Sequence, residues 1–156
     1  MRRFLIGAGV IGALALAGSA QAQAQVVHYT AKLSGASEVP ALKGGKGRGS
    51  FSADLDTATH KLNYKLEFSG LTGPATGAHI HGPGGPAVNA PHIVMIGAAM
   101  EGMSMPMGTV MSPTTGSATL TSAQIAALKA GELYVNVHTA AHPEGEIRGQ
   151  LLSAKP

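Results

Sequence analysis

Apolar residues recur at every second position in several segments of this chain, and this period constrains the fold more than any other feature. The clearest case is 61–71, KLNYKLEFSGL, in which Leu62, Tyr64 and Leu66 alternate with polar residues. A period of two places alternate side chains on opposite faces of a β-strand. The same reading predicts further strands at 26–35, 49–56, 76–81, 92–97, 116–121, 132–139 and 145–152.

A single short segment has helical character. Residues 122–130 are rich in helix formers, Thr121 or Ser122 can cap their start, and Gly131 is suited to end the helix. Many short strands separated by Gly/Pro turns, with one short helix, are typical of antiparallel all-β folds. We therefore predict an all-β domain, an antiparallel sandwich or barrel of Greek-key type with one short helix.

The N-terminal segment 1–24 is expected to be a signal peptide. Arg2 and Arg3 precede an apolar run over 4–17, and small residues spaced as A-x-A close the segment. The run is shorter than the ~20 residues that a bilayer requires. The sequence thus predicts an exported protein, periplasmic or extracellular, whose mature domain spans 25–156 and does not stay attached to a membrane.

Charge and composition exclude several function classes. The chain has 11 Lys and Arg against 8 Asp and Glu, and removing Arg2 and Arg3 with the signal peptide leaves 9 against 8. With neither a basic cluster nor many aromatic residues, nucleic acid is not an expected partner. Cysteine is absent, so disulfides and thiolate ligands are excluded.

Histidines on two of the predicted strands form a candidate metal site. In the segment HIH, an inward Ile80 places His79 and His81 on the outer face. In 132–139, ELYVNVHT, the apolar residues likewise leave His138 on the outer face. Neutral imidazole suits copper and zinc, so these histidines are predicted ligands; the alternative is an ordinary polar surface. Further candidates are His142, in the following loop, and His92.

A methionine-rich segment, 95–111, is a second candidate for copper. It contains six methionines interleaved with Gly, Ser, Pro and Glu. Thioether is a soft ligand that selects Cu(I), and the alternative is a flexible surface loop. The predicted ligands are Met100, Met103, Met105 and Met107, whereas Met95 is expected in the core.

The last two predicted strands carry a polar group of residues. If they form a hairpin, Asn136 lies opposite Arg148 and His138 opposite Glu146, which gathers these four side chains on one face. We expect Arg148 to bond a carboxylate or loop carbonyls in a structural role. No catalytic residues are predicted.

Three blocks of the chain resemble one known family. SGASEVPA, LTGPATGAHIHGPGGP and LYVNVHTAAHPEGEIRGQL are similar, in this order, to the CHRD domain named for chordin. The resemblance implies a single secreted β-domain and no particular reaction. The HIHGPGG block also resembles the H-x-H strand of copper–zinc superoxide dismutases, although their zinc loop and cysteine pair have no counterpart here.

These observations predict an exported CHRD-domain binding module without catalytic activity, which holds copper or, as second choice, zinc. Two alternatives stay open. One is an extracytoplasmic interaction or adhesion domain that binds no metal, with a protein partner that the sequence does not identify. The other is an enzyme of superoxide-dismutase type.

Overall fold

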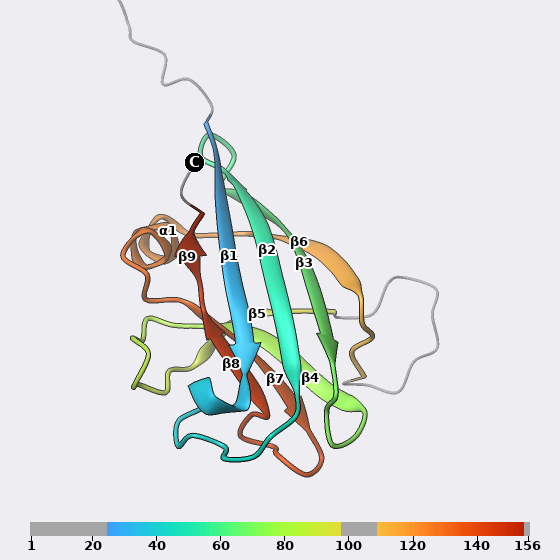
Figure 1. Ribbon diagram of the computed structural model, residues 1–156. Helices are drawn as coiled ribbons and strands as arrows, with labels where there is room; N and C mark the ends of the chain where they lie inside the picture. Colours follow the sequence, from blue (N-terminus) through green and yellow to red (C-terminus); the bar gives the residue numbers. More distant parts are fainter. Residues whose placement is uncertain (1–24, 98–108, 155–156) are drawn as a thin grey trace, which may run out of the picture.

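The computed structural model of the chain describes residues 25–97 and 109–154. Within these ranges the protein consists of nine strands, one α-helix and one 3₁₀ turn (Figure 1). The elements are β1 (Val26–Ser34), η1 (Gly35–Ser37), β2 (Arg48–Asp56), β3 (Lys61–Ser69), β4 (Ala75–His81), β5 (His92–Met95), β6 (Thr114–Thr119), α1 (Ser122–Lys129), β7 (Tyr134–Thr139), β8 (Ile147–Gln150) and β9 (Leu152–Ser153). The predicted all-β class is confirmed, with the last predicted strand divided into β8 and β9.

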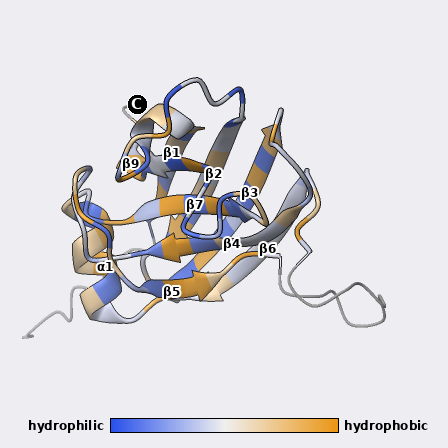
Figure 2. Ribbon diagram, turned by 90° about the horizontal axis from the view of Figure 1, so that it is seen from below, coloured by the Kyte–Doolittle hydropathy of each residue, from blue (hydrophilic) through white to orange (hydrophobic). Residues whose placement is uncertain are grey.

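All the strands belong to one antiparallel sheet. Its order is β5-β4-β7-β8-β1-β2-β3-β6, and β9 pairs with β1. The strands β1, β2 and β3 form a meander, and the much later β8 returns beside β1, as in Greek-key connections. Figures 1 and 2 show the sheet rolled around an interior, with β1, β2 and β3 on one side and β4, β5 and β7 on the other.

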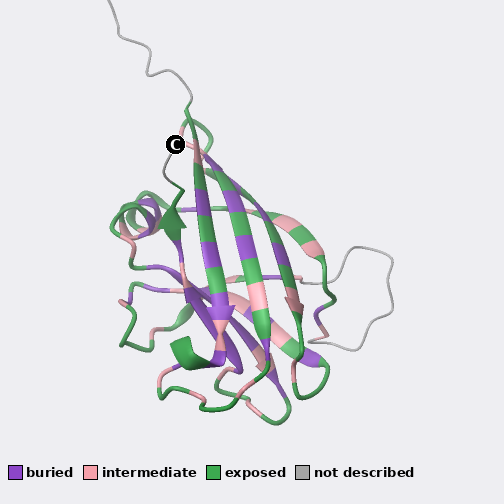
Figure 3. Cartoon of the chain, viewed as in Figure 1, coloured by how far each residue is buried: buried purple, intermediate pink, exposed green. Residues whose placement is uncertain are grey.

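The predicted alternation builds the core of this rolled sheet. In β3, Leu62, Tyr64 and Leu66 are buried, and the polar residues between them are exposed. Figure 3 shows the same alternation as bands along β1 and β2. Burying a leucine side chain contributes about 2 kcal/mol, so these inward faces specify which side of each strand faces the interior.

The helix α1 begins with a capping box. The Thr121 side chain accepts a hydrogen bond from the Gln124 backbone N–H, and the Gln124 side chain accepts one from the Thr121 N–H. Gly131, with φ of +73°, follows its end, as predicted. In the described ranges no helix has the length and apolar character needed to cross a membrane.

The outer face of β7 and β8 is covered, contrary to the exposed polar face expected there. Tyr134, Asn136 and Arg148 are only 2%, 3% and 1% exposed. The segment 82–91 folds back over this face because Arg148 donates hydrogen bonds to the carbonyls of Gly85 and Val88. The molecule therefore has a second, polar buried layer outside the apolar core, and the candidate site lies at its edge.

Candidate metal centre

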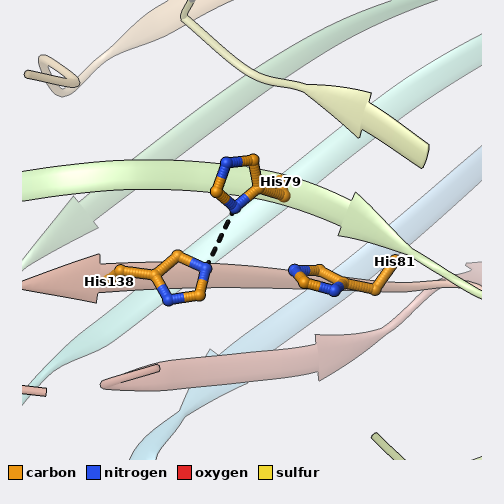
Figure 4. A group of neighbouring side chains, drawn as sticks. All are labelled: His79, His81 and His138. Atoms are coloured by element: carbon orange, nitrogen blue, oxygen red, sulfur yellow. Dashed lines mark hydrogen bonds between the residues drawn. The ribbon is translucent and has the colours of Figure 1, made fainter. Parts of the chain in front are cut away.

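Three predicted histidines converge on the outer face of two neighbouring strands. Strands β4 and β7 pair so that Gly77 is opposite His138 and His79 opposite Asn136. One ring nitrogen from each of His79, His81 and His138 lies within 4.8 Å of the other two. Figure 4 shows the three rings facing one another, with His79 Nδ1 at 3.0 Å from His138 Nε2. The pairing of β4 with β7, which the sequence left open, therefore brings these three candidate ligands together.

Backbone carbonyls determine the tautomers of two of these histidines. His81 Nδ1 lies 2.9 Å from the Ala90 carbonyl oxygen, and His138 Nδ1 lies 2.9 Å from that of Pro143. Because a carbonyl only accepts hydrogen bonds, each Nδ1 carries the proton and each Nε2 keeps a free lone pair. His138 Nε2 accepts from His79, whereas the buried His81 Nε2 has no hydrogen-bond partner among the described residues.

The surroundings keep the three imidazoles neutral. Burial and, to a smaller extent, charge repulsion from the neighbouring His138, His81 and His92 together lower the pKa of His79 to about 4. Burial also lowers the pKa of His81 and of His138, although the hydrogen bonds to backbone carbonyls act in the opposite direction. Neutral imidazole is the form that binds metal, so all three histidines have the charge state required of a ligand at pH 7.

The ring of His81 stacks on the side chain of Tyr134. The His81 ring lies parallel to that of Tyr134, with centroids 4.9 Å apart, and the Arg148 guanidinium carbon lies 3.5 Å from the Tyr134 ring centroid. The Tyr134 hydroxyl also bonds both the N–H and the carbonyl oxygen of Ala90. Tyr134 thus holds the same carbonyl that orients His81, a role that period-two alternation does not reveal.

Glu38 is a buried carboxylate that sequence reasoning did not single out. It is 8% exposed, and Asn136 Nδ2 donates to its two oxygens at 2.9 and 3.0 Å. Burial raises the pKa of Glu38 to about 7, although the positive charge of Arg148 and the hydrogen bond from Asn136 favour the ionised form. Glu38 follows η1 in an irregular segment, where no periodic pattern marks a buried position.

Glu146 was predicted to share one face with Asn136, His138 and Arg148, and this prediction is wrong. Its carboxylate accepts hydrogen bonds from the Thr72 N–H, the Thr72 hydroxyl and the Thr139 hydroxyl. Burial alone would raise the pKa of Glu146, but these hydrogen bonds outweigh it and lower the pKa. The predicted pairing of Asn136 with Arg148 is confirmed, as is the bonding of Arg148 to loop carbonyls.

The other predicted metal ligands do not belong to the cluster of three histidines or lie outside the described residues. His142, in the turn after β7, is not one of the three converging histidines, and the exposed His92 on β5 has its ring centroid 5.0 Å from that of His79. Met100, Met103, Met105 and Met107, like the predicted signal peptide 1–24, lie outside the described residues.

The core position predicted for Met95 is wrong. Its side chain is 62% exposed, whereas the next residue, Ile96, is 2% exposed. The register of β5 explains the difference, because Met95 pairs with His79 and therefore shares the outer face of the sheet with it.

Comparison with known proteins gives one match. The family model of the CHRD domain matches residues 29–151, which include every strand of the sheet except the start of β1 and the short strand β9. No curated protein and no solved structure matches the chain significantly. On the strength of this match across most of its length, the chain belongs to the CHRD-domain family.

Proposed function

We propose that this protein is an exported binding module that holds one metal ion through His79, His81 and His138, with copper preferred to zinc. Membership of the CHRD family supports a binding module rather than an enzyme. The observation that carries the metal proposal is the convergence of three neutral imidazoles. Two of them direct unprotonated Nε2 atoms toward the cluster while a backbone carbonyl holds the opposite nitrogen.

One pair of candidate ligand nitrogens already has nearly the separation of a bound site. Ligand nitrogens at ~2.0 Å from a tetrahedral metal are about 3.3 Å from each other. His79 Nδ1 and His138 Nε2 are already 3.0 Å apart, so a bound ion would replace their hydrogen bond once the proton of His79 has moved from Nδ1 to Nε2, which leaves the imidazole neutral. The other separations among the three ligand nitrogens are at most 4.8 Å, and rotation of the rings would close them. Three protein ligands leave a further coordination position open.

Metal titration tests this function. The protein, freed of metal by a chelator, is expected to bind one equivalent of Cu(II) or Zn(II) in competition with a chromophoric chelator. Replacing His81 or His138 with alanine should weaken metal binding by more than about 100-fold. Loss of a residue that only orients a ligand weakens binding about 10- to 100-fold, and loss of the ligand itself weakens it more. Circular dichroism should show that both variants remain folded.

His28→Ala is the matched control, because His28 is an exposed histidine on β1 that bonds Asp54. Equal loss of affinity in this variant would assign the binding to histidines in general. Absence of stoichiometric binding by the unchanged protein would contradict the metal site and favour the interaction or adhesion module.

Export has its own test. The basic start, apolar run and A-x-A ending of 1–24 support cleavage near residue 24. Mass spectrometry of the protein recovered from the periplasm or the culture medium should find a chain that begins near Gln25. Recovery of the uncleaved chain from the cytoplasm would contradict export.

A further inference from the structure

Met95 is a large apolar side chain exposed beside the histidine cluster. It is 62% exposed on β5, an edge strand of the sheet. Within the register of β4 and β5 it is directly opposite His79. Directly opposed residues of antiparallel strands share a face, with Cβ atoms about 5 Å apart. The thioether is therefore on the same face as the imidazoles, at their solvent side.

The order of the strands makes His79 the centre of this arrangement. Strand β4 lies between β7, which carries His138, and β5, which carries Met95. Because the Met95 side chain is exposed and has flexible bonds, its sulfur can turn toward an ion beside His79 without disturbing the core. Burial of Ile96 on the opposite face keeps Met95 in this orientation.

We propose that Met95 supplies a thioether ligand that completes the site of His79, His81 and His138 and makes it a site for Cu(I). The proposal rests on the metal-binding function proposed above and extends it to the identity and oxidation state of the ion. Thioether sulfur is a soft ligand that favours Cu(I), whereas Zn²⁺ is satisfied by imidazole nitrogen and water. Met95 therefore strengthens Cu(I) binding and leaves zinc binding unchanged.

His92 is the competing fourth ligand. Its ring centroid lies 5.0 Å from that of His79 and 6.3 Å from that of His81. It does not belong to the group whose ligand nitrogens all lie within 4.8 Å of one another. An additional imidazole would serve zinc as well as copper, so the two candidates differ in metal selectivity.

Substitution of Met95 by leucine tests the proposal because it keeps an apolar side chain of similar volume and removes the thioether. We measure Cu(I) affinity under anaerobic conditions, in competition with a chromophoric chelator, and Zn(II) affinity in parallel. Met95→Leu should weaken Cu(I) binding at least about 10-fold, leave Zn(II) binding unchanged and remove a sulfur neighbour of copper from the X-ray absorption spectrum. Met111→Leu, at a methionine that is 59% exposed, is the control and should change none of these.

The outcomes separate this proposal from the metal-binding function. If the protein binds Zn(II) through His81 but Met95→Leu leaves Cu(I) affinity unchanged, the histidine site stands and the thioether ligand is wrong. An equal loss of Cu(I) and Zn(II) affinity would show a packing effect and also overturn it. Loss of Cu(I) binding in His92→Ala but not in Met95→Leu would assign the fourth position to imidazole. Failure of the unchanged protein to bind either metal would contradict both proposals.

Discussion

Replacing Arg148 with alanine is expected to lower the free energy of unfolding by about 4 kcal/mol, a loss at the upper end for a single substitution. The side chain is 1% exposed, and its guanidinium donates to the Asn89 side chain and to the carbonyls of Gly85 and Val88. Hydrogen bonds from a charged donor each contribute about 1.5–3 kcal/mol. The substitution removes all three at once, together with the contact on Tyr134.

The metal centre should weaken with the fold in this variant. Arg148 holds the segment 82–91, whose Ala90 carbonyl orients His81, so loss of the arginine frees that histidine. Urea unfolding followed by circular dichroism measures the stability, and the zinc titration measures the site. Arg48→Ala is the control, because Arg48 is an exposed arginine whose side chain, within 25–97 and 109–154, bonds only the carbonyls of Gly45 and Gly47. If Arg148→Ala lowered the free energy of unfolding no more than Arg48→Ala does, a structural role for the buried guanidinium would be contradicted.

Most of the fold could be predicted because its signals are local. The alternation in β3 determines which side chains face inward within the strand itself, whatever its neighbours are. The start of α1 is equally local, since Thr121 and Gln124 cap each other three residues apart. The order of the strands is not local, and nothing in the alternation reveals that β4 pairs with β7.

The candidate site was predictable only in part for the same reason. An inward Ile80 and Val137 place His79, His81 and His138 on outer faces, but only the pairing of β4 with β7 brings them together. The alternation also assumes that an outer face meets water. Here the segment 82–91 covers it, so residues such as Tyr134 are buried on a face expected to be exposed.

Replacing Glu38 with glutamine is expected to stabilise the protein at alkaline pH. The unfolded chain releases this proton near pH 4.5, whereas burial raises the pKa of Glu38 in the folded protein to about 7. Between these values the folded state binds more protons, so the contribution of Glu38 to stability is fully present below pH 4.5 and is lost as the pH rises toward 7. The difference between the two values corresponds to about 3 kcal/mol.

The side-chain amide of Asn136 explains why the neutral form of Glu38 fits this position. Asn136 Nδ2 donates to Glu38, but the buried Asn136 Oδ1 has no hydrogen-bond partner in the described part of the chain. A protonated carboxyl group, or the amide of glutamine, has both an acceptor for Nδ2 and a donor for Oδ1. Ionised Glu38 has acceptors only, so above pH 7 it leaves Oδ1 unsatisfied and a charge buried.

Urea unfolding from pH 4.5 to pH 8 measures the effect as a difference between the variant and the unchanged protein, both kept free of metal. Glu38→Gln should match the unchanged protein at pH 4.5 and exceed its stability by about 3 kcal/mol at pH 8. Every other ionisable group is the same in the two proteins, so its contribution cancels in the difference. Glu132→Gln removes an exposed carboxylate and should give a difference near zero throughout. If Glu38→Gln instead destabilised the protein at pH 8, the ionised carboxylate would be the form that the fold favours, and attraction to Arg148 would have to outweigh the cost of its burial.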